Sequence, residues 1–267
     1  MLKDITIGQF FPGDTVVHRL DPRIKLILTV VYIVAIFLAK SFVSYAVMLA
    51  ALSAVTALSA VKPRTILRGM KPVVIVIIMT AILNIFFTQG DPIFKLWILR
   101  PTWQGLRTAF FMMLRIIMLI TGTFLLTYTT SPIALTDGLE SLLSPLKKIR
   151  LPVHELAMMM SIALRFIPTL IEETDKIMSA QKARGADFET GRLLERARAM
   201  LPLLVPLFVS AFRRADELAV AMESRCYHGG EGRTRMKKLK TSGRDYAALC
   251  IGAALVAGVA VLGHRGL

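Results

Sequence analysis

Long runs of apolar residues alternate with short polar segments along most of this chain. A helix needs about 20 mostly apolar residues to cross the hydrocarbon core of a bilayer. Five runs approach that length and predict membrane-spanning helices at 24–39, 42–61, 72–89, 109–130 and 246–263. The first run is short, and we expect the flanking Arg23, Lys25 and Lys40 to carry their charges to the interface on their long side chains. The pattern predicts an all-α, polytopic membrane protein.

A different pattern separates the fourth apolar run from the fifth. The 131–244 segment is too long for a simple loop and too apolar for a disordered linker. Its apolar residues recur at helical spacing, which predicts a helical domain inserted before the last span. We expect a helix to stop near Ser144, a long one to run from about Pro152 toward Arg184, a separate short helix at 201–212, and a final helix that ends at Arg225.

The chain is thus predicted to have three parts. Residues 1–130 form a membrane domain with an N-terminal segment and four spans, residues 131–244 form the helical domain, and residues 245–267 form the last membrane helix. The net charge is +15, and most of the basic residues lie in 1–25, 62–71 and 131–244. Because basic loops stay on the cytoplasmic side, we expect the N-terminus and the helical domain to be cytoplasmic and the C-terminus to be outside.

Composition also limits the partners and binding sites that we expect of the chain. In a membrane protein, a basic balance favours contact with anionic lipid over nucleic acid, so we expect no nucleic-acid partner. The two cysteines and four histidines show no disulfide or metal-ligand pattern, so we expect no metal and no cofactor. Arg115 is the one clear charge within a predicted span, and we expect it to reach the interface or to pair with a carbonyl of a neighbouring helix.

Two similar stretches raise the question of function. SAQKARGADFETG (179–191) and AVAMESRCYHGG (219–230) each end a helical pattern with an Arg four residues after an Ala. A shift of 41 residues places Asp175, Ala180 and Arg184 on Asp216, Ala221 and Arg225. They are either two ordinary helix ends, capped by Gly185 in one case, or two copies of a docking device. Cys226 fits a plain helix cap less well than Gly185, because cysteine has no special tolerance for left-handed backbone.

Four segments give the chain a family resemblance. HRLDPRIKLI (18–27), LRFIP (164–168), QKARGADF (181–188) and RRADELAVAMESRCY (213–227) resemble the transmembrane T component of energy-coupling factor (ECF) transporters, the CbiQ-like family. These are ABC-type importers of vitamins and transition-metal ions. The resemblance implies that each Arg-containing motif ends a coupling helix docked on one ATPase of a pair. The docking residues it implies are Ala183, Arg184, Gly185, Ser224, Arg225 and Cys226.

The resemblance also implies a division of labour among subunits. No G-x-x-x-x-G-K-[ST] motif occurs in the sequence, so ATP would be hydrolysed by two partner ATPases, identical or different, and this chain would not be an enzyme. A small membrane S component would capture the substrate. Methionines at 112–113, 158–160 and 178 favour exchangeable partners, and therefore a T component shared by several S components.

Three alternatives remain open at this point. The chain could be a T subunit dedicated to one substrate such as cobalt, nickel or biotin. It could be a stand-alone carrier or channel, although the predicted spans contain no Asp or Glu for cation coupling. It could also be a membrane-embedded enzyme that uses His154 and Glu155.

Overall fold

Every regular element in the described part of the chain is helical. The computed structural model describes residues 10–39, 41–88, 102–188, 193–229 and 239–264. Its α-helices are α1 (Pro22–Leu38), α2 (Phe42–Ser59), α3 (Pro63–Met70), α4 (Val74–Phe87), α5 (Trp103–Thr129), α6 (Pro132–Leu143), α7 (Val153–Ala183), α8 (Leu193–Glu223) and α9 (Gly243–His264). Short 3₁₀ turns join α3 to α4 and α6 to α7. The prediction of an all-α chain is confirmed.

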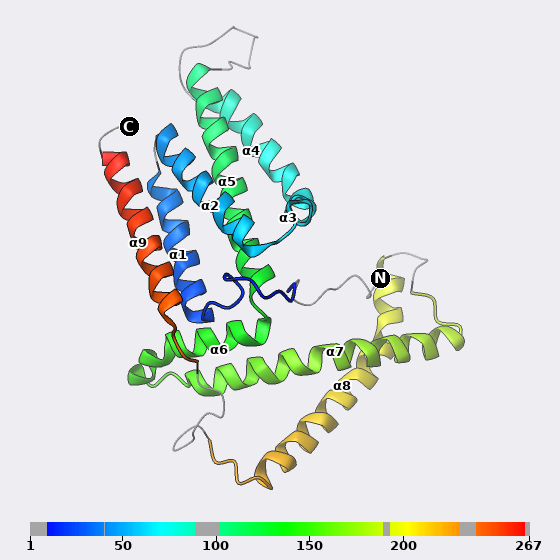
Figure 1. Cartoon of the computed structure of the whole chain (residues 1–267). Coiled ribbons are helices and arrows are strands. Elements are labelled where there is room, and N and C mark those ends of the chain that lie inside the picture. Colours follow the sequence, from blue (N-terminus) through cyan, green and yellow to red (C-terminus); the bar gives the residue numbers. More distant parts are fainter. Residues whose placement is uncertain (1–9, 40, 89–101, 189–192, 230–238, 265–267) are drawn as a thin grey trace. The chain divides into compact units, whose positions relative to one another are not determined.

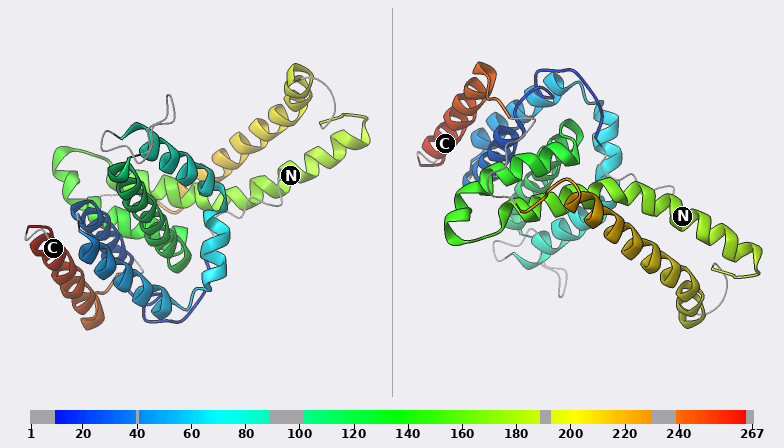
Figure 2. Two further views of the ribbon diagram at one scale, coloured as in Figure 1. Left: turned by 90° about the horizontal axis from the view of Figure 1, so that it is seen from above. Right: turned by 90° about the horizontal axis from the view of Figure 1, so that it is seen from below.

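The chain separates into two compact units. The bundle unit comprises residues 8–138 and 239–267, and the crossing unit comprises residues 1–7 and 139–238. In the bundle unit, α1, α2, α5 and α9 run side by side, and α4 packs along α5 (Figures 1 and 2). Its core combines small and large apolar side chains from four helices, namely Ala35, Ile36, Ala39, Tyr45, Met48, Leu52, Met118, Leu125 and Val259.

Within the described residues, five helical segments are long and apolar enough to cross a membrane. They are α2, α3 together with α4 (Pro63–Phe87), α5, α7 and α9 (Gly243–Gly263). The number agrees with the sequence prediction, but the set differs. At 17 residues α1 would reach only about 25 Å, slightly less than a bilayer core, although its apolar residues pack within the bundle. Conversely α7, which we expected in the helical domain, is apolar enough over one window to qualify.

The charge of Arg115 in α5 is satisfied inside the bundle. The Nε atom of Arg115 donates a hydrogen bond to the Tyr45 hydroxyl at 2.9 Å, and a terminal nitrogen contacts the Ala39 carbonyl at 3.4 Å. The guanidinium also lies over the rings of Phe37 and Tyr45. Because Ala39 ends α1, Arg115 supplies a donor where that helix has unpaired carbonyls. The expected pairing with a neighbouring carbonyl is confirmed.

The expectation that Lys25 reaches the interface is wrong. Lys25 is buried at 6% exposure, and its Nζ donates to two backbone carbonyls and one hydroxyl of the chain. Arg23 is also partly buried, and it pairs with Asp21 and the Leu239 carbonyl. Thr129, Thr130 and Leu239, which lie far away in the sequence, supply acceptors that explain why these cations turn inward. Lys40 lies outside the described residues.

The crossing unit is dominated by two helices of 31 residues each, α7 and α8. The expected ends near Ser144 and Pro152 are close to those observed, since α6 stops at Leu143 and α7 starts at Val153. The expected separation of a short helix at 201–212 from the final helix is wrong. α8 runs through Pro202 and Pro206 without a break, because each proline removes only one backbone donor and the flanking turns keep theirs.

Candidate functional site

The first Arg-containing motif forms the C-terminal cap of α7. Arg184 directly follows the last helical residue, and Gly185 then adopts a left-handed backbone with φ of +89°. The Gly185 amide donates to the Lys182 carbonyl at 3.0 Å, and the Ala186 amide donates to the Gln181 carbonyl at 3.0 Å. These two bonds define a Schellman motif, which satisfies carbonyls that the helix end leaves open.

The second motif repeats this cap at the end of α8. Cys226 has φ of +56°, and its amide donates to the Glu223 carbonyl at 2.9 Å. The Tyr227 amide donates to the Met222 carbonyl at 3.1 Å. Each bond lies 41 residues after its counterpart in the first cap. The two arginines therefore occupy equivalent positions of one backbone motif, and Cys226 takes the place of the glycine despite its side chain.

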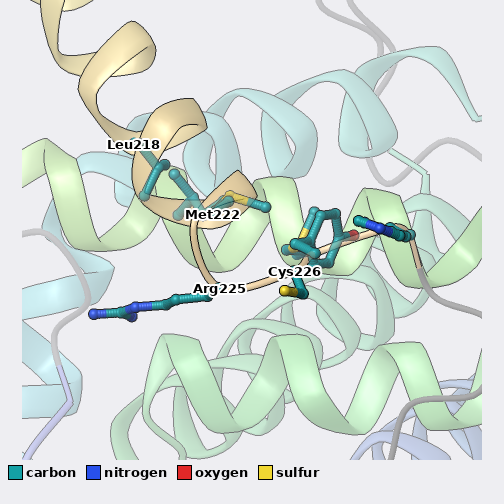
Figure 3. Close-up of a pocket in the computed structure, with 9 residues that line it drawn as sticks. Leu218, Met222, Arg225 and Cys226 are labelled. Atoms are coloured by element: carbon teal, nitrogen blue, oxygen red, sulfur yellow. The ribbon is translucent and has the colours of Figure 1, made fainter.

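The caps present their arginines to the outside. Ala183, Arg184 and Gly185 are exposed, as are Ser224, Arg225 and Cys226. Figure 3 shows the Arg225 side chain extending away from the helix end and away from Leu218, Met222 and Cys226. An exposed guanidinium offers five donors in a planar fork that suits bidentate contact with a carboxylate. At each helix end, terminal carbonyls are thus paired within the chain, and the arginine is exposed to a partner.

An apolar hollow adjoins the second cap. It has a volume of about 400 Å³ and lies between the first half of α7 and the end of α8. Its walls are mostly apolar or aromatic, and they are formed by Met158, Ile162, Leu218, Met222, Arg225, Cys226, Tyr227, His228 and Gly229 (Figure 3). A partner that bound Arg225 would therefore meet an apolar surface beside the charge.

A polar cluster fixes the crossing of α7 and α8. A Glu173 carboxylate oxygen accepts a bond from Arg214 at 3.0 Å, and its other oxygen accepts one from the Ser210 hydroxyl. The Arg214 guanidinium also lies 5.7 Å from the centre of the Phe166 ring. Since Glu173 contacts Ser210 while the earlier Phe166 contacts Arg214, the helices cross in an antiparallel sense (Figure 1).

This crossing places the two caps on opposite arms of the helix pair. About ten residues separate the polar cluster from each helix end, which is about 15 Å of helix at 1.5 Å per residue. Because the helices are antiparallel, α7 and α8 carry their C-terminal ends away from the crossing in opposed directions. The unit therefore holds two similar cationic tips apart, one on each arm of the helix pair.

Other predicted residues of the site have different surroundings. The Nδ1 atom of His154 lies 3.0 Å from a carboxylate oxygen of Glu140, so its partner comes from α6 and is not the neighbouring Glu155. Among the residues that the structure describes, no three His, Cys, Asp or Glu side chains gather in a metal-binding arrangement. The Glu173–Arg214 pair was not predicted from the sequence, although the same 41-residue shift relates the two positions.

Comparison with known proteins gives consistent results. The family model CbiQ, described as cobalt transport protein, matches residues 13–236. A protein of Thermosediminibacter oceani named energy-coupling factor transporter transmembrane protein EcfT is 56% identical over 247 residues, which cover 92% of this chain and 93% of that protein. Proteins of the same name from Heliobacterium modesticaldum and Bacillus subtilis are 57% and 50% identical, over 92% and 93% of this chain and 93% and 94% of their own.

The cap at Gly185 generates a prediction about stability. We expect Gly185→Ala to lower the free energy of unfolding by about 1 kcal/mol, because a Cβ is disfavoured in left-handed backbone. Steric space is not the cause, since a Cβ at Gly185 would meet no atom within 4 Å. Thermal melting of the purified chain in detergent measures the effect.

Gly243→Ala is the matched control for this prediction. A Cβ there also meets nothing within 4 Å, but Gly243 is the first residue of α9 and its φ is not positive. We expect this variant to melt within about 0.5 kcal/mol of the parent. Equal losses in both variants would contradict the assigned cap.

Proposed function

The chain belongs to the CbiQ family of transmembrane transport proteins, and from that premise we propose that it is the T component of an ECF-type importer. It is a multi-pass membrane protein that would link two ATPases in the cytoplasm to a substrate-binding S component in the membrane. The chain itself would be non-catalytic, because its 267 residues contain no P-loop motif.

The observation that carries this proposal is the repeated helix cap. Two Schellman motifs 41 residues apart each expose an Arg at the same position, on opposite arms of a helix pair. A pair of ATPases related by two-fold symmetry or pseudo-symmetry presents two similar grooves, and a single chain needs two similar projections to engage both. An unrelated pair of helix ends would not need the same residue at the same backbone position.

The chemistry of each tip supports a docking role. An Arg that enters a groove can form charge-assisted, bidentate hydrogen bonds to a carboxylate, and these are about twice as strong as neutral ones. The small Ala183 and Ser224 beside the arginines allow close approach of a partner surface. The apolar hollow beside Arg225 adds an area that a partner side chain can fill.

The S component would meet the apolar side chains that α8 leaves exposed. They include Leu204, Val205, Phe208, Val209 and Phe212 in the stretch that contains the two prolines. Met159 and Met160 of α7 are exposed as well. Flexible methionines adapt to different partner surfaces, which favours a T component shared by several S components. A dedicated cobalt subunit is the second candidate, because the matching family model is described as a cobalt transport protein.

The proposed orientation places the crossing unit in the cytoplasm. α1 and α9 begin, and α5 ends, at the same side of the bundle, where Lys25 meets Thr129 and Asp21 meets Asp245. That arrangement agrees with five spans formed by α1, α2, α4, α5 and α9. The assignment of α7 to the cytoplasm rests on its polar second half, which carries Glu172, Glu173, Asp175 and Lys176.

Charge reversal at the tips tests ATPase docking. We expect Arg184→Glu or Arg225→Glu to weaken co-purification of the ATPases, because each loses charge-assisted bonds worth about 1.5–3 kcal/mol. At about 1.4 kcal/mol per factor of ten, the affinity would fall roughly 10- to 100-fold. The measurement is recovery of ATPase subunits with the tagged chain in mild detergent, together with the number of different S components recovered with the parent chain.

Arg213→Glu provides the control for these variants. Arg213 is an exposed arginine of the same helix, about three turns before Arg225, and its reversal changes the net charge equally. We expect it to recover ATPases at the level of the parent. Full recovery with the Arg184→Glu, Arg225→Glu double variant would contradict the proposed function. Recovery of a single kind of S component with the parent chain would favour a T component dedicated to one substrate.

Cys226 allows a test of orientation. With Cys250→Ser, Cys226 is the only thiol, and it is exposed in the chain. In cells that produce the chain without the ATPases, we expect a membrane-impermeant maleimide to label it only after the cells are permeabilised. A cysteine appended after Leu267 in a Cys226→Ser, Cys250→Ser background should instead be labelled in intact cells. Labelling of Cys226 in intact cells would contradict the proposed topology and indicate the opposite orientation.

A further inference from the structure

A cluster of buried charges lies where the ends of three bundle helices meet. Asp21, Lys25 and Asp245 have exposures of only 6%, 6% and 3%, and Arg23 is partly buried beside them. Two of these side chains are acidic and two are basic, so the cluster is close to neutral. It includes the segment that contributes HRLDPRIKLI to the family resemblance, a motif to which the docking proposal gives no role.

Lys25 fastens α1 to the end of α5. Its Nζ donates to the Thr129 carbonyl at 2.8 Å, to the Thr130 hydroxyl at 3.3 Å and to the His18 carbonyl at 3.1 Å. Thr129 is the last residue of α5, so the ammonium lies where that helix has unpaired carbonyls and a negative dipole end. All three donor positions of the ammonium are used.

Asp245 fastens the start of α9 to the start of α1. One of its carboxylate oxygens accepts the Asp21 amide at 2.9 Å, and the other accepts the Ser242 amide at 2.7 Å. Asp21 in turn caps α1 by accepting the Arg23 amide at 2.9 Å. Two buried carboxylates therefore connect two helix starts through backbone donors.

The same cluster contacts the bundle residues at two connections to the crossing unit, those after Gly138 and before Leu239. Downstream of residue 10, the chain leaves the bundle unit after Gly138 and returns to it at Leu239. A terminal nitrogen of Arg23 donates to the Leu239 carbonyl at 2.9 Å. At the other connection, Gly138 packs so closely on α1 that a Cβ there would lie 3.0 Å from the Pro22 Cβ and 3.2 Å from the Arg23 nitrogen.

We propose that residues 21–25 form a clamp that makes the two connections move as one body with α1, α5 and α9. This proposal rests on the proposed function, because the clamp would transfer motion from the docked helices to the membrane bundle. Pro22 and Arg23 are positioning residues in this scheme, and they touch neither nucleotide nor transported substrate.

The physical reason lies in the irregular backbone of the second connection. Residues 239–242 precede α9 without regular structure, and such a segment absorbs displacement unless side chains hold it in place. Buried charges are a costly way to stabilise a fold, since apolar replacements are often at least as stable. They do define one geometry, because each carboxylate and ammonium needs its particular partners. A connection held in this manner transmits a displacement to the bundle.

Arg23→Ala tests the clamp with the rest of the transporter intact. The chain is co-purified with its ATPases, reconstituted with S components, and supplied with tritiated riboflavin, folate or biotin. We expect the ATPases to bind and hydrolyse ATP as with the parent chain, while vitamin uptake per ATP falls by about tenfold, a size typical of changes within a coupling network. Arg23→Lys, which keeps one donor for the Leu239 carbonyl, should recover part of the lost uptake.

Arg19→Ala is the matched control, because Arg19 belongs to the same motif but lies outside the cluster. It pairs with Asp14 at 2.7 Å, and both side chains are largely exposed. We expect its uptake per ATP to equal that of the parent. Hydrogen exchange adds a readout that does not depend on transport: the Ser242 amide should exchange faster in Arg23→Ala than in Arg19→Ala.

A second variant tests the connection that follows Gly138. Gly138→Ala forces the new Cβ against Pro22 and the backbone of Arg23, and we expect the same loss of uptake per ATP with the ATPases still bound. Uptake and hydrolysis that fall in parallel, or that stay at the parent level, would overturn the clamp. Failure of both Arg23→Ala and Gly138→Ala to insert would assign the cluster to stability alone and also overturn it. A parent chain that recovers no ATPase and carries none of the vitamins would instead overturn the proposed function on which the clamp rests.

Discussion

The bundle depends most on the hydrogen bonds that the buried Lys25 ammonium donates. A bilayer offers no water to unpaired polar groups, so a cation near its edge must find acceptors in the chain or reach the surface. Lys25 finds three of them at the end of α5 and just before α1. Asp21 and Asp245 then bring the start of α9 to the same point. These charges fix the ends of three helices at one place, and Gly138 and Leu239 contact α1 there.

A second constraint governs the crossing unit, and it concerns backbone geometry. Each of its two long helices must end so that its last carbonyls are paired and an Arg still faces outward. The Schellman motif meets both needs, and it occurs twice with the same spacing of bonds. The Glu173–Arg214 pair keeps the two ends on opposite arms. The proposed docking at the tips and the proposed clamp at the bundle together describe a path along which motion of two ATPases would reach the membrane.

Much of this arrangement could be predicted from the sequence, and particular residues show where prediction stopped. Helical periodicity and prolines placed the ends of α6 and α7 within a residue or two, because these signals are local. The repeated Arg was visible as a pattern, but the left-handed backbone of Cys226 was not, since nothing in its side chain requires that conformation. Arg23 and Lys25 were misjudged because their partners, Leu239 and Thr129, lie more than 100 residues away in the chain. α8 was likewise predicted as two helices, because local proline signals outweighed a packing partner that the sequence does not show.

Site-specific photocrosslinking can show whether both helix tips contact the ATPases. A photoreactive amino acid placed at Ala183 or at Ser224 lies beside one of the two exposed arginines and leaves both of them in place. In membranes that contain the full transporter, we expect a crosslink to an ATPase subunit from each position, and none from the exposed Arg213 of α8. Crosslinks from both tips to lipid or to nothing, in complexes that still contain the ATPases, would contradict it.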